Sequence, residues 1–145
     1  MPARDAFDPE LFLPYLLNQA AEGASLSFQR VYTDRYGMLR NEWRVMFHLG
    51  AYGPMTARAI CDRAHMHKTK ISRAVAALER RRFLRRVPQA TDRRSAMLHL
   101  TGAGRAAYDD LAAVARDHDA RLTRGMSDSE LALLRRVLIR LARSG

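Results

Sequence analysis

Residues 67–81 read HKTKISRAVAALERR, and residues 83–100 read FLRRVPQATDRRSAMLHL. The first stretch carries apolar side chains at three- and four-residue steps, which predicts a helix with one apolar face. Its apolar positions are Ile71, Ala74, Val75 and Leu78. In the second stretch, two short runs at 83–87 and 96–100 flank a polar, turn-prone segment, which predicts a β-hairpin with a basic tip. The two stretches therefore predict a helix that leads directly into a two-stranded sheet.

A shorter helix is predicted just upstream of this pair. Thr56 can cap a helix over about 57–63, and the helical pattern breaks near His65 before the next helix begins. Two helices joined by a tight turn form a helix-turn-helix, and the hairpin adds a wing. We therefore expect a winged helix-turn-helix lobe over residues 37–100.

Further helices are predicted before the helix-turn-helix and after the hairpin. An apolar face recurs through residues 11–36, and Gly37 is a plausible stop for that helix. Asn41 can cap a second helix that ends at about Gly50. After the hairpin, Thr101 can cap a long helix with a heptad-like apolar seam.

The last predicted helix begins with a capping-box pattern. Ser127 would cap it, and Glu130 follows three residues later, ahead of a leucine stripe. One lobe cannot cover apolar faces on both of its flanks, so residues 8–36 and 102–143 are expected to be dimerisation helices. The predicted fold class is mainly α (α+β), with a single domain over residues 1–145.

The positive charge of the chain is concentrated in its centre. The whole chain has a net charge of +10, and the segment from Arg63 to Arg94 holds eleven basic and two acidic residues, a net charge of +9. Concentrated positive charge on a folded segment favours a polyanionic partner, because contact with phosphates releases condensed counterions. Charge alone does not separate DNA from RNA or from an anionic membrane.

The pattern of the two central helices favours double-stranded DNA. In a helix-turn-helix, the second helix enters the major groove with its N-terminal residues leading. The side chains there that can reach phosphates or base edges are Lys68, Thr69, Lys70, Ser72 and Arg73. Arg93 and Arg94 at the wing tip suit the narrow minor groove. Asp92 is expected to pair with a neighbouring arginine and to support the shape of the wing.

Around these residues the sequence resembles the MarR family. The motifs that carry the resemblance are HKTKISRAV at 67–75, TDRRS at 91–95 and LHLTGAGR at 98–105. The Asp-x-Arg wing followed by Leu-x-Leu-Thr-x-x-Gly is a fairly specific pattern, and the long flanking helices match the family architecture as well. The resemblance implies a winged-helix homodimer that binds palindromic DNA sites. It further implies a regulator, usually a repressor, that is released by a small aromatic or phenolic anion or by oxidation.

In this family the ligand crevice lies between the dimerisation helices and the DNA-binding lobe. By position, Phe28, Tyr32, Trp43 and Phe47 are candidates to line it, with Arg30 available for a carboxylate. The alternative for Trp43 and Phe47 is a place in the core, because aromatic residues at helical spacing on an apolar face commonly pack there.

Two positions depart from the family pattern. Arg82 stands where a glycine usually follows the recognition helix, and a non-glycine residue with positive φ costs about 1 kcal/mol. A locally different turn, and a shifted entry angle of the wing, are therefore expected. Arg40 replaces the usual Thr or Ser cap of the second helix, which is why the cap is assigned to Asn41.

The remaining reactive residues give little sign of another chemistry. Cys61 is read as a buried structural residue rather than as a redox sensor, because the oxidation sensors of the family carry their cysteine in the first helix. His65 and His67 point apart at a two-residue spacing, so neither a metal site nor a cofactor is expected.

Other classes of function are disfavoured by what the chain lacks. It shows no nucleophile–base set, no phosphate-binding glycine loop and no paired carboxylates, so an enzyme is not expected. No segment of the sequence predicts a signal peptide or a membrane span, so the expected location is the cytoplasm. The alternative that stays open is an architectural DNA-binding protein that is indifferent to sequence.

Overall fold

A computed structural model describes residues 6–91 and 95–144. In chain order its elements are the short 3-10 helix Pro9–Leu11, then α1 (Leu13–Tyr36), α2 (Arg40–Tyr52), β1 (Met55–Thr56), α3 (Ala57–Ala64), α4 (Lys68–Arg80), β2 (Leu84–Pro88), β3 (Ala96–Leu100), α5 (Gly102–Leu122) and α6 (Asp128–Ala142). The predicted mainly helical fold with a small sheet is thus confirmed. None of the helices in the described ranges is both long and apolar enough to cross a membrane.

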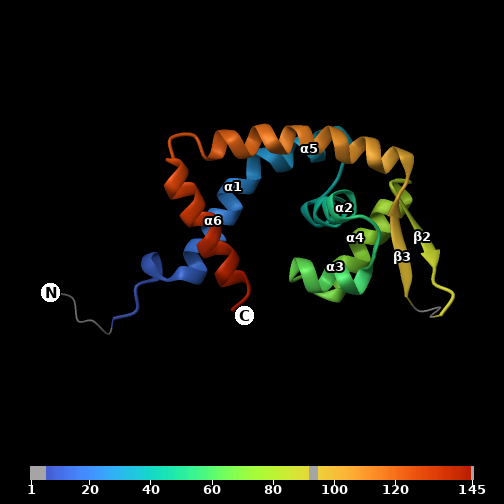
Figure 1. Cartoon of the computed structure of the whole chain (residues 1–145), viewed down its shortest axis with the longest axis horizontal. Coiled ribbons are helices and arrows are strands. Elements are labelled where there is room, and N and C mark those ends of the chain that lie inside the picture. The colour runs from blue at the N-terminus through green and yellow to red at the C-terminus, as the bar shows by residue number, and fades with distance from the viewer. Residues whose placement is uncertain (1–5, 92–94, 145) are drawn as a thin grey trace.

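The long helix α5 connects two parts of the molecule. One end of α5 lies above a lobe made of α2, α3, α4 and the sheet, while α1 and α6 descend near its other end (Figure 1). In the sheet, β3 lies between β1 and β2 and pairs antiparallel with both. The hairpin of β2 and β3 was predicted, but β1 was not, because a two-residue strand carries no alternating pattern.

Three of the four predicted side-chain caps are present at the starts of helices. Thr56 accepts the backbone N–H of Ala59 at 3.1 Å, and Thr101 accepts that of Gly104 at 3.0 Å. Ser127 and Glu130 form the predicted capping box of α6. The prediction for α2 was wrong: the helix begins at Arg40, and the N-cap is Leu39 rather than Asn41. A carboxylate inside the helix replaces the missing cap, because the Leu39 N–H donates to Glu42 at 2.6 Å.

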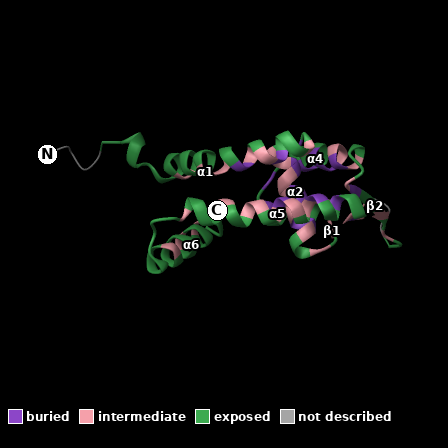
Figure 2. Cartoon of the chain, turned by 90° about the horizontal axis from the view of Figure 1, so that it is seen from above, coloured by how far each residue is buried: buried purple, intermediate pink, exposed green. Residues whose placement is uncertain are grey.

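The hydrophobic core lies inside the lobe and under the adjoining half of α5. The buried side chains include Val45, Met46, Leu49, Ile60, Ile71, Ala74, Val75, Leu78, Leu98 and Leu111. The predicted inner stripe of α4 is therefore confirmed. Burial stops toward the other end of the molecule, where α6 and the first half of α1 are mainly exposed (Figure 2).

Arg82 adopts the left-handed conformation in the turn between α4 and β2. Its φ angle is 62°, its N–H donates to Glu79 O at 2.9 Å, and its own carbonyl accepts the Thr101 hydroxyl at 2.6 Å. The turn therefore keeps a backbone conformation that glycine prefers, at a cost of about 1 kcal/mol for arginine. The expectation of a different turn conformation at Arg82 was wrong, because hydrogen bonds on both sides of the residue hold the left-handed form.

Candidate DNA interface and ligand crevice

The first half of α4 presents the predicted DNA-reading side chains to solvent. His67 caps the helix by accepting the Thr69 N–H at 3.2 Å. The residues expected to contact DNA are all exposed: Lys68, Thr69, Lys70, Ser72 and Arg73. The opposite face of the helix is anchored by Ile71, Ala74, Val75 and Leu78 in the core. The helix thus offers cationic and hydroxyl groups on a rigid support, which suits recognition in a groove.

A surface groove of about 490 Å³ runs between α3, α4 and the wing. Lys68 and Ser72 line it from α4, and Arg58 and Cys61 line it from α3. Cys61 is half-buried and packs against the core, so the prediction of a buried cysteine is confirmed only in part. The reason is its position on the rim of α3, where one side of the thiol faces the groove rather than the core.

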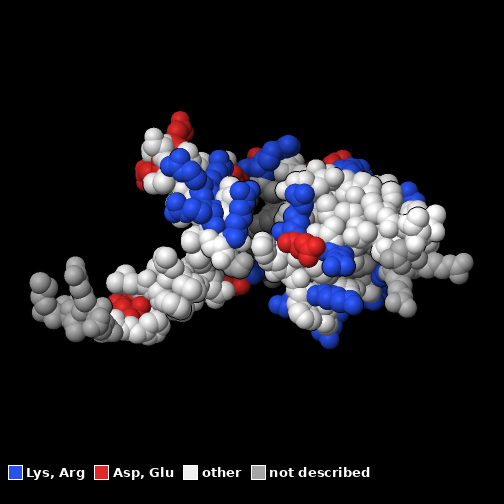
Figure 3. Space-filling model, turned by 60° about the horizontal axis from the view of Figure 1, so that its bottom comes forward, with Lys and Arg blue, Asp and Glu red and all other residues white. Residues whose placement is uncertain are grey.

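The wing root is held by a surface ion pair. Arg86 on β2 donates through Nε to Glu79 of α4 at 2.8 Å. The predicted tip residues Asp92, Arg93 and Arg94 lie outside the described residues. Figure 3 shows the underside of the molecule, where Lys and Arg side chains stand out on the lobe and again at the opposite end of the chain.

A second cavity, also of about 490 Å³, separates the lobe from the long helices. Its aromatic wall consists of Phe28 and Tyr32 from α1 and of Trp43 and Phe47 from α2. The Phe28 ring meets the Trp43 ring edge-on at 5.2 Å between centroids. His118 and Leu122 of α5 complete another side of it, and His118 stacks on Phe28 at 5.7 Å. We call this cavity the crevice.

Two arginines from α2 supply the positive charge of the crevice. Arg44 lines it and donates to Ala64 O at 2.9 Å, and none of the ion pairs found among the described residues includes Arg44. Burial, together with the nearby Arg40, lowers the pKa of Arg44 from its usual value. Partial burial of a cation without a counter-ion is unfavourable, so an anion in the crevice would be stabilised.

Arg40 lines the crevice and has one hydrogen-bond donor without a partner. Its terminal nitrogens bind Glu22 at 2.6 Å and Gln29 at 3.2 Å, both on α1. Its Nε is buried and has no acceptor. The hydrogen bond with Glu22 raises the pKa of Arg40, so the side chain stays charged. A donor of this kind is costly unless an acceptor fills the site.

Arg30 does not occupy the place expected for it. The side chain is exposed and is absent from the walls of the crevice. Phe28 and Tyr32 share one face of α1, and a residue midway between them points away because each residue turns the helix by about 100°. Arg40 and Arg44 were not assigned to the crevice from sequence, although the helical spacing of Arg40, Trp43, Arg44 and Phe47 puts them on one side of α2.

Comparison with known proteins finds similarity to one family. Residues 36–95 match the model of the MarR family. The fold also matches the solved structure of a MarR-family transcriptional regulator from Silicibacter pomeroyi, which is 26% identical, with a TM-score of 0.77 over 95% of this chain and 93% of that one. The winged helix-turn-helix part of the chain is therefore similar to the MarR family. The transcriptional regulator PA4135 is also similar, with 25% identity and a TM-score of 0.81 over 92% of this chain and 98% of that one.

Two more distant MarR-like structures contain a bound partner. A MarR mutant from E. coli, complexed with operator DNA, is 18% identical, with a TM-score of 0.80 over 94% of this chain and 98% of that one. NadR, in complex with 4-hydroxyphenylacetate, is 19% identical, with a TM-score of 0.81 over the whole of both chains. Identities this low show a shared fold alone. No curated protein sequence matches the chain.

Proposed function

We propose that this chain is a transcription regulator of the MarR family that binds palindromic operators as a homodimer, represses from them, and is released by a small aromatic or phenolic anion. The observation that carries the DNA part is the exposed first half of α4, where Lys68, Lys70 and Arg73 stand beside Thr69 and Ser72. These groups can make phosphate contacts and also read base edges. Arg93 and Arg94 would add wing contacts in the minor groove, supported by Asp92.

The homodimer is supported by apolar side chains that the single chain leaves exposed. They lie in the N-terminal arm, at the start of α1 and along the end of α5 and α6: Phe7, Leu11, Phe12, Leu13, Tyr15, Leu16, Leu122, Met126, Leu133, Leu134, Leu138 and Ile139. So many exposed large apolar side chains at one end of the molecule favour an interface there. A second copy that covers it would place two α4 helices on one duplex, with half-sites about 34 Å apart.

The effector part rests on the chemistry of the crevice. Aromatic rings line one side, and Arg40 and Arg44 line the same space. A flat ring that carries an acidic group would satisfy both features at once. NadR has been solved with such a compound, 4-hydroxyphenylacetate. A ligand that prefers a dimer with another spacing of the α4 helices would lower DNA affinity by its differential binding free energy.

A salt titration of DNA binding tests the proposal. The affinity is measured for a duplex from upstream of the protein's own coding region and for a scrambled duplex of equal length. A preference of about a thousandfold at physiological salt, with two chains per site, is expected of a specific dimeric regulator. Equal and steeply salt-dependent binding to both, and to duplexes selected from a random pool, would instead indicate an architectural protein.

A further inference from the structure

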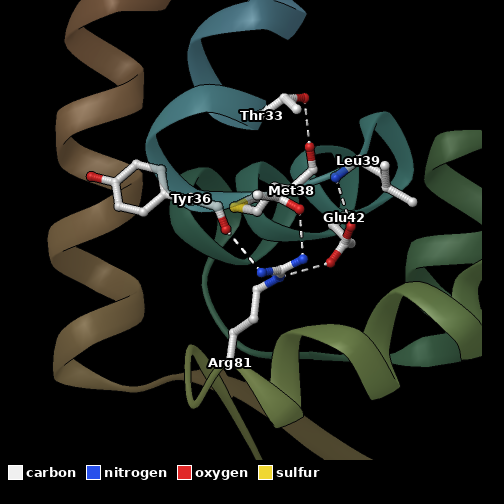
Figure 4. A network of polar contacts seen from close by, with 7 residues as sticks. Thr33, Tyr36, Met38, Leu39, Glu42 and Arg81 are labelled. Carbon is white, nitrogen blue, oxygen red and sulfur yellow. Dashed lines mark hydrogen bonds and ion pairs between the residues drawn. The ribbon is translucent and has the colours of Figure 1, made fainter.

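The guanidinium of Arg81 joins the ends of three helices. Arg81 follows α4 directly, and its two terminal nitrogens donate to Tyr36 O at 2.9 Å and Gly37 O at 2.6 Å, at the end of α1. Its Nε donates to Glu42 at 3.0 Å, in the first turn of α2. The second oxygen of Glu42 accepts the Leu39 N–H at 2.6 Å. Figure 4 shows these contacts converging on the connection between α1 and α2.

The contact is costly to break. The Glu42 side chain is only 4% exposed, and that of Arg81 is 33% exposed. Removing either partner would leave the other charge, or the helix-end carbonyls, without compensation, and the loss is largest for a buried carboxylate. The carbonyls at the end of α1 also carry the negative end of its dipole, which a cation stabilises. We call the contacts of Arg81 with Tyr36, Gly37 and Glu42 the clamp.

The absence of a side chain at Gly37 leaves room for the guanidinium of Arg81. Its φ angle of 66° is left-handed, and a Cβ there would lie 3.2 Å from Nη1 of Arg81. Glycine therefore both ends α1 and admits the guanidinium. Nearby, Met38 is fully buried, and its carbonyl accepts the Thr33 hydroxyl at 2.8 Å. The segment that receives Arg81 is consequently fixed on its other side as well.

The clamp lies at the far end of α4 from the reading residues. The helix has 13 residues, Lys68–Arg80, and is therefore about 20 Å long. A tilt of about 5° around its C-terminal end would move its reading end by about 1.7 Å over that length. Displacements of about 1 Å are enough to disrupt directional hydrogen bonds, so the angle set at Arg81 matters for base contacts more than for diffuse attraction to phosphates.

We propose that Arg81 is a positioning residue for DNA recognition: it fixes the angle of α4 through the connection between α1 and α2 and does not itself bind DNA. The same connection leads into Arg40, whose side chain faces the crevice. A movement of this connection would therefore reach α4 through Glu42 and Arg81. The inference rests on the proposed sequence-specific DNA binding.

Three single variants separate positioning from charge. Arg81→Lys keeps the charge but loses the forked geometry, Glu42→Gln raises the net charge of the chain by one, and Arg80→Lys is the matched control at an exposed neighbour. Urea unfolding first establishes that each is folded under the binding conditions. Affinity is then measured for the operator and for the scrambled duplex across a range of salt concentrations.

The clamp predicts that Arg81→Lys and Glu42→Gln each weaken operator binding by about tenfold or more. For both variants, the affinity for the scrambled duplex and the slope of log affinity against log salt should stay close to the wild-type values. Arg80→Lys should bind both duplexes as wild type does. The double variant of Arg81→Lys and Glu42→Gln should bind the operator no more weakly than the weaker-binding single variant does, because both substitutions remove the same contact.

Two results would refute the proposed positioning role of Arg81. One is operator affinity within twofold of wild type for Arg81→Lys and Glu42→Gln. The other is an equal loss on both duplexes with a shallower salt slope, which would make Arg81 a phosphate contact. A wild-type chain without operator preference would instead refute the proposed function itself. If Arg81→Lys does not fold, Glu42→Gln decides alone, because a charge effect would tighten its binding whereas loss of the clamp would weaken it.

Discussion

Gly104 and Phe83 approach each other so closely that no other residue fits at position 104. A Cβ built on Gly104 would lie 2.0 Å from the carbonyl oxygen of Phe83. The same oxygen accepts the Thr101 N–H at 3.0 Å. The first turn of α5 therefore packs directly against the turn that precedes the wing. This close contact is the steric reason why the Thr-x-x-Gly motif needs glycine at position 104.

Gly104→Ala should destabilise the fold strongly. Overpacking against rigid backbone costs about 1–3 kcal/mol or more, because a carbonyl cannot rotate away as a side chain can. Gly102→Ala is the matched control, since a Cβ at Gly102 would meet nothing within 4 Å. It should be neutral or slightly stabilising, by up to about 1 kcal/mol. Urea unfolding of both variants measures the difference, and equal stability would contradict the close contact.

Arg82→Gly should stabilise the protein. The left-handed conformation at residue 82 costs arginine about 1 kcal/mol that glycine does not incur. Part of this gain is offset by the greater backbone freedom of glycine in the unfolded chain, so a net gain below about 1 kcal/mol is expected. Thermal unfolding would register it as an increase in melting temperature. A decrease would mean that the Arg82 side chain contributes more than its backbone costs.

His48 should make stability depend on pH. The side chain is buried and its Nδ1 lies 2.6 Å from Arg44 O. Burial lowers its pKa in the folded state, and the nearby Arg63 and Arg44 charges act in the same direction. The unfolded chain, with a pKa near 6.5, therefore binds the proton first, and stability is lost as the pH falls below about 6.5.

The variant His48→Gln tests this source of the pH dependence. Its free energy of unfolding should change less than that of wild type between pH 7.5 and pH 5.5. Above pH 7, both proteins should show little dependence on pH from this group. Parallel curves for the two proteins below pH 6.5 would assign the effect to other residues.

Trp43 should report ligand binding in the crevice directly. It is the only tryptophan of the chain, so quenching of its fluorescence has a single source. We expect saturable quenching by 4-hydroxyphenylacetate and much weaker binding of the neutral amide, 4-hydroxyphenylacetamide. Arg40→Gln should weaken acid binding about tenfold or more, since a hydrogen bond to a charged group contributes about 1.5–3 kcal/mol.

The exposed Arg30 supplies the matched control for this titration. Arg30→Gln removes the same charge from α1 without touching a wall of the crevice. It should bind the acid as wild type does. Equal loss in both arginine variants would point to a general charge effect, and an absence of quenching by the acid in wild type would refute the effector proposal for this compound.

Lys70→Ala should weaken DNA binding and reduce its dependence on salt. Each lost phosphate contact lowers the slope of log affinity against log salt by about 0.9, or about 1.8 for a dimer. Arg94→Ala should weaken specific binding severalfold without unfolding the protein. Arg116→Ala removes the same charge from an exposed site on α5 and serves as control. Unchanged affinity for Lys70→Ala would contradict the assignment of the reading helix.

Local patterns in the sequence predicted most of the fold. The stripe of Ile71 to Leu78, the cap at Thr101 and the capping box at Ser127 are decided by neighbours within one or two helical turns, and the structure confirms all three. The cap of α2 was predicted wrongly because Glu42 carries out the capping from inside the helix. A two-residue strand such as β1 is formed by its partner β3 and has no signature of its own.

The candidate site was less accessible from sequence. Four aromatic residues of the crevice were predicted from the family resemblance, which places a crevice between the dimerisation helices and the lobe. The cationic role was assigned to Arg30, whereas Arg40 and Arg44 line the crevice, because which arginine faces a cavity depends on the packing of α1 against α2. The clamp joins Arg81 to Glu42 across 39 positions in sequence, and no local pattern could have indicated it.

The continuous helix α5 sets a strict length requirement on this architecture. It has 21 residues, or about 31 Å, with Gly104 fixed against the wing at one end and His118 forming the crevice at the other. Each residue inserted between these two points would rotate His118 by about 100° around the helix axis and displace it by about 1.5 Å. One or two extra residues would thus turn the wall of the crevice away from Phe28 even though the lobe itself still folds. Insertions of three or four residues come closest to restoring that side of the helix, so changes in the length of α5 are compatible with the crevice only in steps of a helical turn.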